Sequence, residues 1–77
     1  MSIIPVLKSA QLIQALRRAG FIIIRQSGSH VRLRHMFDQT RQTTVPKHNS
    51  DLPRWLLAVI LRQAKVSTKE LLQYLGK

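Results

Sequence analysis

The sequence predicts an α+β domain in which a three-stranded antiparallel sheet carries its helices on one face, in the order α-β-β-β-α-α. Three observations lead to this prediction. Apolar residues recur at helical three- and four-residue spacing near both ends of the chain, the middle holds three short β-type segments, and a Ser-Gly-Ser turn separates the first two of them. With 77 residues, the chain has room for one domain, spanning 1–77.

The first helix is expected to begin at Ser9, whose hydroxyl can cap it, and to end at Gly20. Its inward positions follow helical spacing and are Leu12, Ile13, Leu16 and Ala19. The next segment, residues 21–26, begins with a bulky and mostly β-branched run that is too short for a helix. We therefore expect a well-buried strand there.

A hairpin turn is expected at residues 27–29, where Gly28 can supply a positive φ. The alternating segment 30–36 then pairs back on the first strand. Alternate residues of a strand share a face, so one face carries His30, Arg32 and Arg34 and the other carries Val31 and Leu33. Because the apolar pair needs the core, the histidine and arginine face is expected to be exposed to water.

The rest of the chain completes the sheet and the helical layer. Residues 41–45 are expected to form a third, more exposed strand that Pro46 stops. After a polar link at 47–50, Asp51 can cap a second helix, with Pro53 in its first turn. The expected inward stripe of this helix is Trp55, Leu56, Val59, Ile60 and Gln63. A capping box of Ser67 and Glu70 predicts a last helix that carries Leu71, Leu72 and Leu75.

The charge balance indicates the kind of partner. Thirteen Lys and Arg residues are present against three Asp and Glu, which gives a formal net charge of +10, so a polyanion or an acidic protein is expected as the partner.

The chain has no cysteine, which excludes a disulfide framework, thiolate zinc sites and thiol catalysis. No apolar run is long enough to span a bilayer and the first residues do not resemble a secretory signal, so a soluble cytoplasmic protein without membrane attachment is expected.

His30 is the strongest candidate for chemistry. An imidazole is largely uncharged near pH 7 and can remove a proton, while neighbouring cations bind phosphate oxygens. The candidate phosphate contacts are Arg25, Arg32, Arg34 and Lys47. The alternative for His30 is a hairpin residue without reactivity. His48 is either a second proton carrier or, as we favour, a ring that shapes the loop, and His35, on the apolar face, is expected to be structural.

Metal chemistry is not expected. The three histidines and Asp38 could supply ligands, but the close-set ligand pairs of zinc sites and the convergent carboxylates of magnesium nucleases are missing. We therefore predict no metal or other cofactor, and activity that is insensitive to chelators.

Four segments together resemble the HicA toxin family: Ala19-Gly20-Phe21, Gln26-Ser27-Gly28-Ser29-His30, Val45-Pro46-Lys47-His48-Asn49 and Leu61-Arg62-Gln63-Ala64. The resemblance implies a double-stranded-RNA-binding-domain-like fold, cleavage of messenger RNA, and neutralisation by a HicB-type antitoxin. The family's catalytic histidine falls on His30 and its hairpin glycine on Gly28. Gly28, Ser29 and His48 join the arginines and Lys47 as expected substrate contacts.

Two positions depart from the family's pattern. Trp55 stands where relatives usually have a small residue, and Lys65 replaces the glycine that often follows the second helix. The expected antitoxin is acidic and covers the surface of His30 and the arginines, giving a toxin that is monomeric when free and hetero-oligomeric with its antitoxin.

Two alternatives to a metal-independent ribonuclease toxin stay open. One is a non-catalytic RNA-binding module, such as a translational repressor. The other is a DNA-binding regulator that uses the helix after Pro53, although that helix has no evident helix-turn-helix partner.

Overall fold

The computed structural model describes residues 4–47 and 50–76. In this part of the chain the order is α1 (Ser9–Arg18), β1 (Phe21–Ser27), β2 (His30–His35), β3 (Gln42–Pro46), α2 (Arg54–Ala64) and α3 (Thr68–Leu75). The strands form one antiparallel sheet in the order β1-β2-β3. The α+β prediction and its element order are therefore confirmed.

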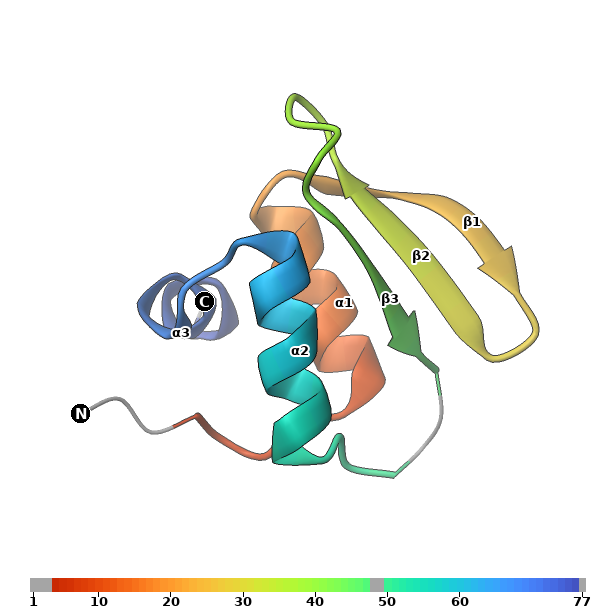
Figure 1. The fold of residues 1–77 in the computed structure, drawn as a ribbon. Helices are drawn as coiled ribbons and strands as arrows, with labels where there is room; N and C mark the ends of the chain where they lie inside the picture. The colour runs from red at the N-terminus through yellow and green to blue at the C-terminus, as the bar shows by residue number, and fades with distance from the viewer. Residues whose placement is uncertain (1–3, 48–49, 77) are drawn as a thin grey trace.

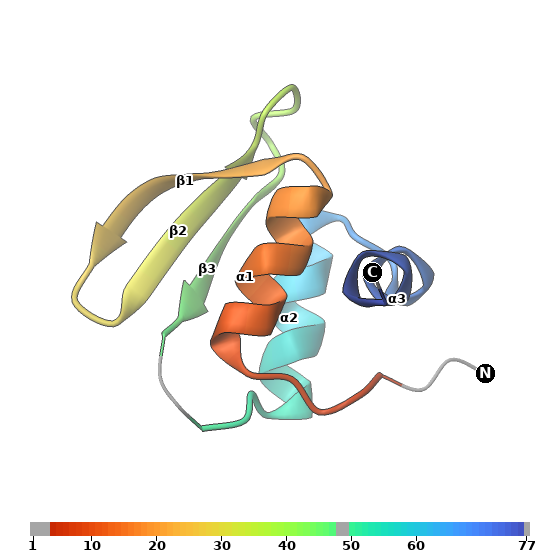
Figure 2. The same cartoon turned by 180° about the vertical axis from the view of Figure 1, so that it is seen from behind.

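The helices and the sheet form two layers. Figures 1 and 2 show α1 and α2 side by side across one face of the sheet, with α3 next to them and the end of the β1–β2 hairpin projecting beyond the helices. The alternation of β2 is as expected, because Val31 and Leu33 are buried while Arg32 is exposed. The core between the layers contains Leu12, Leu16, Phe21, Val31, Leu33, Val45, Leu57, Ile60, Leu61 and Leu71.

The start of α1 differs from the prediction. Ser9 is the first helical residue and Lys8 is the cap residue, with its backbone N–H donating to Oε1 of Gln11 at 2.9 Å. The Ser9 hydroxyl is buried and donates to the carbonyl of Pro46. Ser9 therefore ties α1 to the end of β3, since a buried hydroxyl must find a partner wherever the fold offers one.

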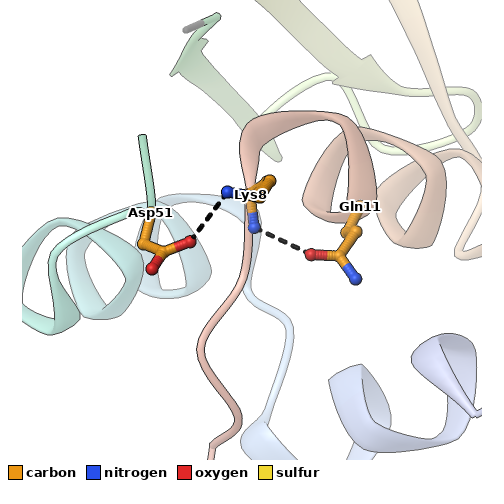
Figure 3. Close-up of polar contacts among 3 residues, drawn as sticks. All are labelled: Lys8, Gln11 and Asp51. Atoms are coloured by element: carbon orange, nitrogen blue, oxygen red, sulfur yellow. Dashed lines mark hydrogen bonds and ion pairs between the residues drawn. The ribbon is translucent and has the colours of Figure 1, made fainter. Parts of the chain in front are cut away.

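The start of α2 also lies elsewhere than expected. Pro53 is the cap residue and the helix begins at Arg54, two residues later than a cap at Asp51 would place it. The Asp51 carboxylate instead accepts from Nζ of Lys8 at 3.2 Å (Figure 3). Because the N–H of Leu52 also donates to the carbonyl of Leu7 at 2.8 Å, the segments before α1 and α2 are held together.

The buried face of α2 is rotated from the predicted stripe. The structure buries Leu57, Ile60, Leu61 and Ala64, whereas Trp55 is 69% exposed and Gln63 is exposed. Apolar residues run through the whole first half of this helix, so helical spacing alone does not select one face. Contact with β3 decides which residues turn inward.

The predicted burial of two strands, β1 and β3, is wrong. β1 was expected to be well buried, but Ile22, Ile23 and Ile24 are 38–40% exposed and only Phe21 is buried. β1 is an edge strand whose far end projects past the helices (Figure 1). β3 was expected to be the more exposed strand, but it lies against α2 and buries Thr43 and Val45, and Pro46 is its last residue rather than its stop.

The junction between α2 and α3 is well defined. Lys65 ends α2 with φ 57° and ψ 41°, the left-handed conformation that glycine adopts most easily. The predicted capping box is confirmed: Ser67 N–H donates to Oε1 of Glu70 at 2.9 Å, and Glu70 N–H donates to Oγ of Ser67 at 3.1 Å. The backbone N–H of Ser67, and after it the Ser67 side chain, act on the Glu70 carboxyl and hold its pKa below the ordinary value. Leu71 is buried, and Leu72 and Leu75 are half-buried.

Candidate functional site

A two-residue turn sets the position of His30. β1 ends at Ser27 and β2 begins at His30, so the loop is Gly28 and Ser29. Gly28 has φ +56°, and a positive φ confined to the first loop residue is typical of a type II′ turn. The Ser29 carbonyl accepts from the backbone N–H of Lys47, which joins the turn to the chain after β3. His30 is therefore presented, exposed, at the edge of a fixed hairpin.

The strand register brings polar side chains around His30 on the outer face of the sheet. Ser27 pairs with His30, and Thr44 pairs with Arg32. Paired residues of neighbouring antiparallel strands share a face. The result is a shallow hollow of about 320 Å³, here called the His30 pocket, lined by Arg25, Ser27, His30, Arg32 and Thr44.

A β-bulge places Arg25 in the His30 pocket. Ile23 pairs with Leu33 and Arg25 pairs with Arg32, so Ile24 is an extra residue between them. Strict alternation from Ile22, which pairs with Arg34 on the outer face, would have turned Arg25 toward the inner face. The bulge shifts the alternation by one residue and re-aims the guanidinium toward His30. Three consecutive isoleucines carry no alternation, so this bulge could not be predicted from the sequence.

The two other arginines of the outer face differ in how they are held. Nη2 of Arg32 donates to Oε1 of Gln42 at 3.0 Å, and Nε2 of Gln42 donates to the carbonyl of Gln39 at 2.7 Å. These two hydrogen bonds orient the Arg32 guanidinium on the outer face. Arg34 is half-buried, and its Nε is buried without a hydrogen-bond partner in the described ranges. Arg34 lines no part of the His30 pocket.

Two of the expected substrate contacts that the structure describes, Arg34 and Lys47, do not line the His30 pocket. Lys47 is exposed and lines a different hollow, between α1 and the inner face of the hairpin. His48 lies outside the described residues. Gly28 and Ser29 form the turn between Ser27 and His30, and neither lines the pocket.

His35 is a structural histidine, as predicted. Its Nδ1 accepts from the backbone N–H groups of Phe37 at 3.2 Å and Asp38 at 3.1 Å, so it shapes the loop after β2. Its ring stands edge-on to Phe21 with ring centroids 5.2 Å apart. A Cβ on Gly20, where φ is +103°, would come within 3.0 Å of His35 Nε2. Glycine is therefore needed there for space as well as for backbone conformation.

The described acidic residues all lie away from the His30 pocket. Asp51 pairs with Lys8, Glu70 belongs to the α3 capping box, and Asp38 accepts from the hydroxyl and backbone N–H of Thr40, which lowers the pKa of Asp38. The His30 pocket therefore has two guanidinium groups and no carboxylate among its lining residues. Within residues 4–47 and 50–76, no three His, Asp or Glu side chains are placed to hold a metal ion, and no helix could cross a membrane.

The sequence model of the family described as "HicA toxin of bacterial toxin-antitoxin" matches residues 9–66. The chain belongs to the HicA toxin family. The match runs from the start of α1 past the end of α2 and includes the whole sheet, so the His30 pocket lies inside the HicA region. α3, at Thr68–Leu75, lies beyond it. A comparison with curated proteins finds no match. As a HicA toxin, the protein is one partner of a toxin–antitoxin pair.

Proposed function

We propose that this HicA toxin is a metal-independent endoribonuclease that cleaves messenger RNA, with His30 as its catalytic residue. The observation that carries the proposal is the His30 pocket, in which an exposed imidazole lies among two guanidinium groups and two hydroxyls on a rigid sheet. RNA supplies the missing nucleophile, because each ribose has a 2′-hydroxyl next to the phosphate that it can attack.

The reaction follows from these groups. His30 takes the proton of the 2′-hydroxyl, the 2′-oxygen forms a bond to phosphorus, and the bond from phosphorus to the 5′-oxygen breaks. Water, or the imidazolium formed in the first step, returns a proton to the leaving oxygen. Arg25 and Arg32 stabilise the negative charge that develops on the phosphate oxygens, and a guanidinium can bind two such oxygens at once. The products carry a 2′,3′-cyclic phosphate and a 5′-hydroxyl.

The proposed localisation and partner follow from the family. A toxin that acts on messenger RNA works in the cytoplasm. Its proposed antitoxin is an acidic protein of the HicB type that covers the His30 pocket and so competes with RNA. The free toxin is proposed to be a monomer that becomes part of a hetero-oligomer when the antitoxin binds.

A substrate with one deoxyribose tests the mechanism. The purified toxin is incubated with an RNA oligonucleotide and with the same strand carrying a single 2′-deoxyribose on the 5′ side of the mapped cleavage position, both in EDTA. We expect the RNA to be cut with a cyclic phosphate at the new end, and the substituted strand to survive at that position. Cutting of the substituted strand there, or cutting that EDTA abolishes, would contradict the mechanism. Intact RNA with a folded toxin would favour a non-catalytic RNA-binding module.

A further inference from the structure

A larger hollow lies on the other side of the hairpin from the His30 pocket. It has a volume of about 570 Å³ and lies between α1 and the inner face of β1 and β2. We call it the hairpin groove. Figure 2 shows the hairpin extending past α1 on this side of the sheet. The lining of the groove includes Ile13, Gln14, Arg17, Ile23, Val31 and Lys47.

The floor of the hairpin groove is apolar and incompletely covered. Ile23 pairs with Leu33 on the inner face of the sheet, yet it is 40% exposed, so the helical layer covers it only in part. Ile13 of α1 is half-buried and Val31 is buried beneath them. Such a floor gains stability when an apolar side chain replaces the water over it.

The rim of the hairpin groove is cationic. Arg17, in the last turn of α1, and Lys47, after β3, are both exposed, and none of the residues that line the groove is acidic. The groove therefore complements a partner that combines negative charge with apolar side chains. A protein segment has both, whereas the apolar floor offers little to the phosphates and sugars of RNA.

We propose that the hairpin groove is a docking site for the antitoxin, taking an acidic segment that places an apolar side chain on Ile13 and Ile23 and carboxylates beside Arg17 and Lys47. The proposal rests on the antitoxin part of the proposed function and is independent of the cleavage part. Ser27 and His30 pair on the outer face while Gln26 and Val31 pair on the inner face, so this segment lies behind the hairpin. The antitoxin would then hold the hairpin from this side in addition to covering the His30 pocket on the outer face.

The test measures the affinity of toxin variants for the purified antitoxin encoded beside the toxin gene. The groove variants are Arg17→Glu, Ile23→Ser and the milder Gln14→Glu. Arg62→Glu is a matched control, because Arg62 is also an exposed arginine in the last turn of a helix, but it lies on α2 and does not line the groove. RNA binding and thermal unfolding are measured on the same proteins.

We expect Arg17→Glu and Ile23→Ser to raise the dissociation constant for the antitoxin at least tenfold, and Gln14→Glu to raise it severalfold. Arg62→Glu should stay within about threefold of the parent. RNA binding by Arg17→Glu and Arg62→Glu should be equal, because both make the same change in net charge. The proposal is overturned if Arg17→Glu and Ile23→Ser bind antitoxin within threefold of the parent. It is also overturned if Arg62→Glu loses as much antitoxin affinity as Arg17→Glu, or if the groove variants lose RNA affinity instead.

Discussion

His30 and His35 lie on the same strand, yet their surroundings give them opposite roles. His30 begins β2 on the outer face, exposed and beside Arg25 and Arg32. His35 ends β2 on the inner face, where its Nδ1 accepts two backbone N–H bonds. Strand alternation separates the two faces, because positions 30 and 35 have opposite parity. One histidine is exposed to solvent and the other holds a loop.

This difference predicts a contrast in stability. His35→Ala removes the acceptor of two backbone N–H groups and a ring that packs against Phe21, and should lower the free energy of unfolding by about 1–3 kcal/mol. In a domain of this size that is a fall in Tm of at least about 4 °C. His30→Ala, the same substitution at an exposed site, should change stability by less than about 0.5 kcal/mol. Equal melting temperatures for the two variants in a thermal unfolding experiment would contradict the assignment.

At the scale of single residues, burial could be predicted from the sequence where only one arrangement places the apolar side chains in the core. Val31 and Leu33 alternate with charged residues, so their burial, and with it the exposure of His30, followed from the sequence. The structural roles of Ser9 and Asp51 could not be predicted from the sequence. Each could cap a helix locally, and only the tertiary contacts with Pro46 and Lys8 decide otherwise.

Among the elements, α2 ends in an unusual way. Lys65 takes the left-handed conformation, and Arg41 fixes this end of the helix by donating from Nε to the carbonyl of Ala64 at 2.8 Å and from Nη2 to that of Lys65 at 3.2 Å. The left-handed conformation costs an L-residue with a Cβ about 1–2 kcal/mol. Lys65 therefore ends α2 in a conformation that costs stability.

The cost can be measured by restoring the glycine. Lys65→Gly should be more stable than Lys65→Ala by about 1 kcal/mol, because both lose the contact of Lys65 Nζ with Thr40 and only glycine relieves the backbone. Chemical denaturation of the two variants gives this difference directly. An alanine variant as stable as the glycine variant would show that the left-handed conformation carries no such cost.

The elements themselves were easier to predict than their faces. The hairpin at Gly28 and the capping box at Ser67 are local signals, and both are confirmed. The bulge at Ile24 and the inward face of α2 are not local, since runs of apolar residues satisfy several arrangements equally. The bulge matters most for the proposed function, because it brings Arg25 to the His30 pocket.

For the whole molecule, the dominant property is a formal net charge of +10 on 77 residues. The proposed substrate surface uses only part of this charge. Arg25 and Arg32 line the His30 pocket, whereas Arg54 and Arg62 lie on α2, in the helical layer. In the proposed function, the general field would attract RNA from any direction, and the outer face of the sheet would hold it in place.

The salt dependence of RNA binding distinguishes these two contributions. Each phosphate neutralised on a single strand contributes about −0.7 to the slope of log affinity against log salt. The double variant Arg25→Gln, Arg32→Gln should therefore reduce the magnitude of the slope by about 1.4. The double variant Arg54→Gln, Arg62→Gln, with the same change in net charge, should leave the slope nearly unchanged. Equal losses of slope in the two double variants would show that RNA binding is not confined to the outer face.

The central claim is that the exposed imidazole of His30 performs the proton transfer, and the rate of RNA cleavage by His30→Ala tests it most directly. The parent and the variant are compared at saturating enzyme in a single turnover, after circular dichroism shows that both are folded. The account predicts that the variant is slower by at least about 100-fold, the typical contribution of a general acid–base group. Cleavage by His30→Ala within about threefold of the parent rate would contradict it.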